Sequence, residues 1–364
     1  MRSLVTAQNA DLTNCYPSCN IDVTMVCYDA IITVTNPQKE KHPMFRKSIL
    51  TALLVMVTAV AAHAEKTVVD AKIKKYTPAA GVAGNLGSIG SDSLNNLMTY
   101  WAEGFKKKYP NVNIQIEGKG SSTAPPALIA STAQLGPMSR EMKSSEIEEF
   151  EKKHGFKPTK IGVALDSLAV FVNKDNPIKS LSLDKVDAIF SKTHKRGAAD
   201  VSTWGQLGVT GKLAAMPISL YGRNSASGTY GYFKEHALSK GDFKNTVKEQ
   251  PGSASVVEGV AKDIGAIGYS GIGYATSGVR AVPLSDKEGG KVAEASYANV
   301  LNGSYPMARM LYVYVAKKPG EPLPKVVEEF LRYALSKEGQ EVVIKDGYDP
   351  LTAKLVDDQL KVLK

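Results

Sequence analysis

Short apolar runs alternate with amphipathic helical runs along this chain, and this alternation limits the fold more than any other feature. Residues 112–117 alternate apolar and polar side chains, which is the pattern of a strand with one buried face. The apolar residues of 94–105 follow the 3.6-residue spacing of one helical face, and Pro110 ends that pattern. Strand and helix patterns in alternation predict an α/β protein.

The same patterns extend to the C-terminus. Strands are predicted at 83–89, 161–165, 168–173, 266–269 and 310–316. Helices are predicted at 125–132, 146–153, 183–190, 229–239, 325–336 and 339–345. The polar segment 192–201 has the composition of a surface loop.

Residues 44–64 have the three parts of a secretory signal peptide. Arg46 and Lys47 give a positive start, 48–62 is apolar, and Ala62-His63-Ala64 is an A-x-A cleavage motif. We expect cleavage between Ala64 and Glu65 and a periplasmic protein, with release from the cell left open. An uncleaved membrane anchor is the second interpretation. Because such signals begin at the N-terminus, we expect residues 1–43 to be an upstream addition, poorly ordered.

The chain from Glu65 onward has 300 residues, which is enough for two domains. It contains no cysteine, because Cys15, Cys19 and Cys27 all precede the signal peptide. Their spacing is therefore not read as a metal or disulfide site. The net charge of this part is about +8, without a Lys/Arg block, so nucleic acid is not an expected partner. No zinc-ligand spacing is present, and no metal or cofactor is expected.

The segment Arg223–Thr229 (RNSASGT) has the composition of an anion-binding cup. It lies between an apolar run and a helix pattern, so its N–H groups and hydroxyls would lie at a helix N-terminus. Gly228 allows close backbone approach, and Arg223 adds a permanently charged, forked donor. An ordinary capped helix beside an arginine is the alternative interpretation of this segment alone.

Three more segments of this type occur at a predicted strand end or helix start. They are 88–93 (SIGSDS), 118–123 (GKGSST) and 136–140 (GPMSR). Open α/β sheets bind ligands at such positions. Any one segment is more often a helix cap, but four together favour one small oxyanion site.

An esterase or phosphatase is the alternative from another functional class. Asp92-Ser93-Leu94 is similar to the nucleophile block of GDSL esterases, with Ser93 as the nucleophile. Residue 91 is Ser instead of Gly, however, and the late D-x-x-H motif is absent. The last histidine is His236, so a Ser-His-Asp triad in the expected order is hard to build. We therefore expect no enzyme.

Together these residues resemble the PstS family, the periplasmic phosphate-binding proteins of phosphate ABC transporters. The resemblance covers nearly all of 80–350 and rests on the four segments above and on 189–191 with Trp204, 266–269 and 348–351. It implies a two-lobed type II (Venus-flytrap) fold with the ligand cleft between lobes. Lobe 1 would comprise 65–163 plus 273–364, and lobe 2 would comprise 164–272.

The family resemblance also implies the function and the ligand positions. The protein would be a monomeric receptor that captures inorganic phosphate and delivers it to a membrane permease; sulfate or molybdate is the alternative ligand. The implied ligand positions are Ser91, Asp92, Ser121, Arg223, Ser227, Gly228 and Thr229.

The residue at position 139 differs from the pattern of the family. Several members place there an Asp that accepts the proton of phosphate, whereas this chain has Ser139 followed by Arg140. Asp166 and Asp92 are candidates for the missing acceptor, and we count Ser139, Arg140 and Asp166 with the expected ligand-binding residues above. A strand-end Asx turn for Asp166 and a first-turn helix acid for Asp92 are equally open interpretations.

Overall fold

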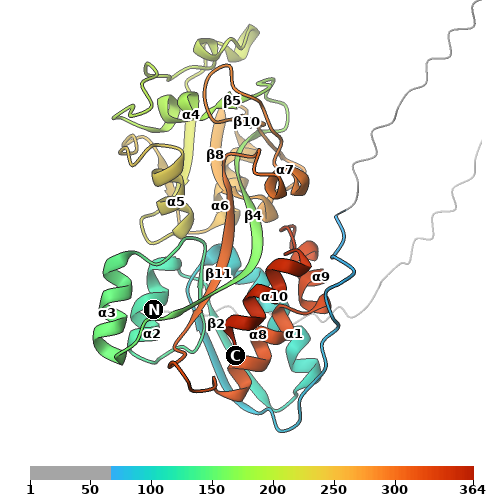
Figure 1. Cartoon of the computed structure of the whole chain (residues 1–364). Coiled ribbons are helices and arrows are strands. Elements are labelled where there is room, and N and C mark those ends of the chain that lie inside the picture. The colour runs from blue at the N-terminus through green and yellow to red at the C-terminus, as the bar shows by residue number, and fades with distance from the viewer. Residues whose placement is uncertain (1–66) are drawn as a thin grey trace, which may run out of the picture. The chain divides into compact units, whose positions relative to one another are not determined.

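The computed structural model describes residues 67–364 (Figure 1). The predictions for residues 1–43, for the signal peptide and for cleavage before Glu65 lie outside this range. Within 67–364, no helix combines the length and the apolar character that crossing a membrane requires.

Helices and strands alternate through the described residues, which confirms the α/β class. The helices are α1 Asn95–Lys108, α2 Ala124–Ile129, α3 Ser144–His154, α4 Leu183–Phe190, α5 Gly228–His236, α6 Ser253–Lys262, α7 Tyr297–Leu301, α8 Lys325–Ala334, α9 Lys337–Lys345 and α10 Ala353–Val362. The strands are β1 Gly84–Ile89, β2 Val112–Glu117, β3 Gly136–Met138, β4 Thr159–Asn173, β5 Leu181–Ser182, β6 Ser219–Arg223, β7 Lys248–Gln250, β8 Ala266–Gly271, β9 Val279–Ala281, β10 Leu284–Ser285 and β11 Ala308–Val315.

The largest sheet is organised around the 15-residue strand β4. Its strand order is β3-β11-β4-β8-β6-β7, and β9 also pairs with β4. Residues 159–167 of β4 pair with β11, and residues 168–172 pair with β8. Figure 1 shows β4 and β11 running from one group of helices to the other.

The structure has one strand where the sequence predicted two separate runs, 161–165 and 168–173. The residues between them, Asp166 and Ser167, are fully buried. Asp166 remains in the strand because its charge is paired across the sheet with Arg309, so the chain does not have to turn toward solvent there.

The described residues form two main hydrophobic cores that divide along β4 and β11. The first takes its residues from 73–165 and 311–363, with Trp101, Phe105 and Phe330 among its largest side chains. The second spans 168–307, around Phe190 and Phe233.

The second core also includes residues beyond the expected lobe boundary at residue 272. These residues are Val282, Leu284, Ala293, Tyr305 and Met307. The expected division placed them in lobe 1, whereas their side chains pack with the core of 168–307.

Candidate functional site

Three serines that follow different strands meet in the interior. Ser91 follows β1, Ser121 begins the turn after β2, and Ser139 follows β3. Ser91 Oγ donates to Ser139 Oγ at 3.0 Å, and Ser139 N donates to Ser121 Oγ at 3.0 Å. All three are buried. We call Ser91, Ser121 and Ser139 the serine cluster; the sequence predicted each as a ligand residue.

The first turn of α5 packs against the serine cluster. A Cβ at Gly228 would collide with Ser121 Oγ and lie 2.6 Å from Ser139 Oγ, so this approach requires glycine. Ser227 caps the helix by accepting from the N–H groups of Thr229 and Tyr230. The structure thus brings the predicted residues Ser227, Gly228 and Thr229 to the serine cluster.

Arg223 ends β6 and is buried. Its Nη1 lies 2.9 Å from Asp92 Oδ2 and donates to Ser253 Oγ at 2.7 Å, while Nη2 donates to Pro251 O. Ser253 N also donates to Asp92 Oδ2, at 2.8 Å. Arg223 Nε is buried and has no hydrogen-bond partner among residues 67–364. The structure therefore pairs two predicted site residues, Asp92 and Arg223, and leaves one donor of the guanidinium unused.

Asp166 makes a different contact from the predicted one. It lies opposite Arg309 in the β4–β11 register, and its Oδ2 accepts from Arg309 Nε at 2.8 Å and lies 2.7 Å from Nη2. Its Oδ1 accepts from Ile272 N at 3.0 Å. Asp166 therefore fixes an arginine, and both of its oxygens have protein partners.

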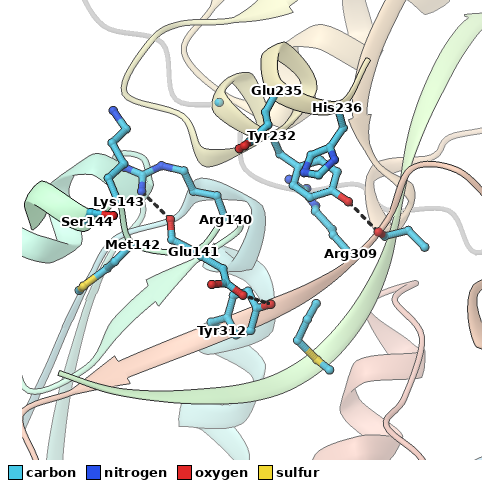
Figure 2. Close-up of a pocket in the computed structure, with 13 residues that line it drawn as sticks. Arg140, Glu141, Met142, Lys143, Ser144, Tyr232, Glu235, His236, Arg309 and Tyr312 are labelled. Atoms are coloured by element: carbon cyan, nitrogen blue, oxygen red, sulfur yellow. Dashed lines mark hydrogen bonds between the residues drawn. The ribbon is translucent and has the colours of Figure 1, made fainter. Parts of the chain in front are cut away.

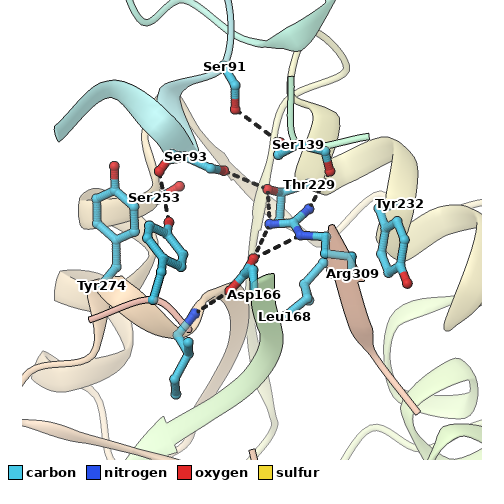
Figure 3. Close-up of polar contacts among 12 residues, drawn as sticks. Ser91, Ser93, Ser139, Asp166, Leu168, Thr229, Tyr232, Ser253, Tyr274 and Arg309 are labelled. Atoms are coloured by element: carbon cyan, nitrogen blue, oxygen red, sulfur yellow. Dashed lines mark hydrogen bonds and ion pairs between the residues drawn. The ribbon is translucent and has the colours of Figure 1, made fainter. Parts of the chain in front are cut away.

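Sequence reasoning missed Arg309. Its Nη1 donates to Ser139 O at 2.8 Å, and its Nη2 donates to Thr229 Oγ1 at 3.0 Å (Figure 3). The available signal was a charge inside the otherwise largely apolar strand run of 308–315, because a buried strand holds an arginine only with a partner.

The Arg140 guanidinium binds α3 instead of the serine cluster. It forms a bidentate pair with Glu146, at 2.7 and 2.6 Å, and Nη2 also donates to Ser122 Oγ. Burial alone would raise the pKa of Glu146, but hydrogen bonds from Arg140 and from Lys143 N hold it below its ordinary value. Arg140 is thus ion-paired next to the serine cluster.

A cavity of about 660 Å³ lies beside these arginines (Figure 2). Arg140, Arg309, Tyr232 and His236 contribute to its lining. The ring of His236 stacks on Tyr232 at 4.0 Å, and burial lowers the pKa of His236. Among the lining residues, Arg140, Arg309, Tyr232 and His236 therefore already contact other protein groups.

Ser93, the nucleophile of the esterase interpretation, has a hydroxyl partner. Its Oγ lies 2.9 Å from Thr229 Oγ1. No histidine among residues 67–364 hydrogen-bonds to Ser93, and no group of three metal-ligating side chains occurs in this range. The hydroxyl of Ser93 is therefore hydrogen-bonded to Thr229, and the histidine of a Ser-His-Asp triad does not contact it among residues 67–364.

Comparison with known proteins gives consistent matches. The family model of the PBP superfamily domain matches residues 76–338. The phosphate-binding protein PstS of Pseudomonas aeruginosa is 55% identical over 318 residues, which cover 87% of this chain and 98% of the relative. Protein SphX of Synechococcus elongatus is 29% identical over 73% of this chain and 77% of its own length.

Solved structures match over a similar range. A Clostridium perfringens protein, assigned as a phosphate ABC transporter substrate-binding protein and solved with bound phosphate, shares 27% identity at a TM-score of 0.62. The match covers 74% of this chain and 100% of that one. An ABC-type phosphate transport receptor from Vibrio cholerae matches at 20% identity and a TM-score of 0.57, over 73% and 100% of the two chains. The second match is evidence for the fold alone.

Proposed function

This chain belongs to the PstS family of the PBP superfamily, and we propose that it captures inorganic phosphate and delivers it to a membrane ABC importer. The family predicted from sequence and its type II α/β fold are confirmed by the matches. The Pseudomonas aeruginosa relative is a phosphate-binding protein, and the Clostridium perfringens structure holds bound phosphate. This proposal extends that ligand to this chain.

The convergence of the serine cluster with the first turn of α5 carries the proposal. Buried hydroxyls and a helix N-terminus suit a small tetrahedral oxyanion, because they offer several donors and a favourable dipole. Arg223 supplies charge and a buried Nε that has no partner among the described residues. We propose that the ligand contacts Ser91, Asp92, Ser121, Ser139, Arg223, Ser227, Gly228 and Thr229. Arg140 and Asp166 then act indirectly, through Glu146 and Arg309.

The two cores support a cleft-closure mechanism. We propose a first lobe of 67–165 plus 309–364 and a second lobe of 166–308, joined by β4 and β11. Closure would place α5 of the second lobe against the serine cluster of the first and exclude water from the anion. Excluding water strengthens each charge-assisted hydrogen bond.

Thermal unfolding of residues 65–364 with phosphate, sulfate or molybdate tests this function. A ligand that binds the native state raises Tm by mass action. We expect phosphate to raise it and equal concentrations of sulfate or molybdate to have little effect. A larger rise with either of the other anions would identify a different oxyanion receptor.

The same sample tests the proposal that the protein is not an enzyme. We expect no release of p-nitrophenol from p-nitrophenyl phosphate above background. Release that disappears in Ser93→Ala would instead identify a phosphatase.

We also propose that the protein is exported after cleavage before Glu65. Intact-mass analysis of the exported protein should give the mass of residues 65–364. A mass that includes 44–64 would contradict cleavage, and one that includes 1–43 would contradict the expectation that these residues are an upstream addition.

A further inference from the structure

Arg309 and Asp166 form a buried ion pair on the two strands that join the proposed lobes. They are direct register partners of β11 and β4, and their side chains are 1% and 0% exposed. Both residues belong to one sheet, so movement of the lobes does not have to separate them. The ion pair can therefore remain intact while the proposed lobes move relative to one another.

The other donors of Arg309 contact opposite sides of the cleft. Nη1 donates to Ser139 O, in the serine cluster, and Nη2 donates to Thr229 Oγ1, in the first turn of α5. The guanidinium carbon also lies 5.5 Å from the ring centroid of Tyr232, on the same helix. Figure 3 shows Arg309 between these groups. Arg309 can hydrogen-bond to Ser139 and to Thr229 at the same time only when the two sides of the cleft are close together.

Counting protons in this network leaves one donor unused. A guanidinium has donors only, so Thr229 Oγ1 accepts from Arg309. Thr229 and Ser93 share one further hydrogen bond, and either can donate it. The remaining hydroxyl proton of this pair has no acceptor among residues 67–364, although both side chains are buried. A buried donor without a partner is costly, and a bound anion would satisfy it.

We propose that Arg309 is a positioning residue that responds to cleft closure and directs the spare hydroxyl proton of the Thr229–Ser93 pair at the anion. The proposal rests on the phosphate-binding function above. Asp166 neutralises the charge of Arg309, so Arg309 acts through its fork geometry. Lysine at this position keeps the charge but offers a compact ammonium in place of a planar fork.

Arg309→Lys tests whether the planar geometry of the guanidinium is required. Thr229→Val removes the hydroxyl group and leaves the Asp166–Arg309 ion pair unchanged. For both variants and the double variant we would measure the phosphate Kd by calorimetry, Tm without ligand, and the ligand-induced decrease in radius of gyration by small-angle scattering. Arg332→Lys is the matched control, because Arg332 makes two hydrogen bonds to Glu328 on α8, outside the proposed contact residues.

We expect Arg309→Lys to weaken phosphate binding at least tenfold and to reduce the compaction, while the control binds like the parent. The effects of Arg309→Lys and Thr229→Val should be strongly non-additive, because both break the same contact. If the ion pair had only a structural role, Arg309→Lys would lower Tm, and its effect on binding would not be coupled to that of Thr229→Val.

Two results would overturn the inference: parental affinity in Arg309→Lys, or effects that multiply independently in the double variant. A parent that does not bind phosphate would overturn the proposed function itself, and this inference with it. Should Arg309→Lys melt too low to titrate, Arg309→Gln combined with Asp166→Asn removes the ion pair without leaving a buried charge. The same tenfold loss is expected of it, and parental affinity would again refute the proposal.

Discussion

The carboxylate of Asp92 and the guanidinium of Arg223 lie 2.9 Å apart, although their neighbours pack in different cores. Leu94, just after Asp92, belongs to the first core, and Leu220, on the strand of Arg223, belongs to the second. Ser253 is hydrogen-bonded to both side chains. This ion pair therefore holds the two proposed lobes together beside the serine cluster.

Removing the guanidinium of Arg223 should weaken phosphate binding. A charge-assisted hydrogen bond contributes about 1.5–3 kcal/mol, so Arg223→Ala should raise the phosphate Kd at least about tenfold. Isothermal calorimetry measures this, with Arg332→Ala as the control on a remote helix. If the Arg223 variant binds like the parent, the arginine has only a structural role.

A methyl group at Gly228 should block the site without unfolding the protein. Its Cβ would meet Ser121 Oγ and Ser139 Oγ, which lie across the proposed cleft. Gly228→Ala should therefore abolish measurable phosphate binding and change Tm without ligand only slightly. Gly231→Ala is the control on the same helix, because its Cβ would lie 3.3 Å from the flexible Arg140 Cδ. Parental binding by Gly228→Ala would show that α5 does not approach the serine cluster in the bound state.

Asparagine substitutions should separate the roles of the two carboxylates. Phosphate near neutral pH carries a proton that a carboxylate can accept, whereas sulfate carries none. Both oxygens of Asp166 accept hydrogen bonds, while Asp92 Oδ1 accepts none from the described residues. We expect Asp92→Asn to improve sulfate binding relative to phosphate, because a repulsive acceptor becomes an amide. We expect Asp166→Asn to weaken both anions alike.

Competition titrations of phosphate against sulfate measure that ratio in each variant. If sulfate binding relative to phosphate improves in Asp166→Asn alone, Asp166 is the proton acceptor and Asp92 is not. Unchanged discrimination in both variants would assign selectivity to the hydroxyl geometry around Ser139.

One buried carboxyl group, that of Asp349, should stabilise the protein less as pH rises toward neutrality. Burial, followed by the charge of Asp166, raises the pKa of Asp349 to about 7. Because the folded state holds this proton more tightly than the unfolded state, the contribution of Asp349 is greatest below pH of about 4. It declines up to pH of about 7 and then stays constant. Asp349→Asn should therefore reduce the drop in Tm between pH 5 and pH 8.

The exposed Asp357, changed to Asn, is the control for that experiment. It should show the pH dependence of the parent. Equal drops in the Asp349 variant and the parent would place the pKa of Asp349 outside this window.

Local patterns predicted most helices and the strands of six or more residues, but not the shorter strands. The helical face of 94–105 lies within α1 and the turn before it, and the alternating 112–117 forms β2. The helices α6, α7 and α10 were missed. The first two lie between predicted elements and the third lies at the chain end, and α6 contains Gly259, which packs against the ring of Tyr221. Such packing is a tertiary property that helix propensity alone does not reveal.

In the candidate site, too, some residues could be predicted from the sequence and some contacts could not. Ser121 and Gly228 could be identified because turn and helix-start chemistry is local. The Asp166–Arg309 and Asp92–Arg223 pairs could not, because each joins residues far apart in the sequence through strand register and lobe contact. A charge in an apolar strand indicates that a partner exists without indicating which residue it is.

The measurement that tests the account most directly is a calorimetric titration of ligand-free residues 65–364 with phosphate and, separately, with sulfate. We predict one phosphate bound per chain, with no sulfate binding at the same concentrations, and no phosphate binding by Gly228→Ala. Phosphate binding that survives in Gly228→Ala, or equal binding of sulfate, would contradict a phosphate site between the serine cluster and α5.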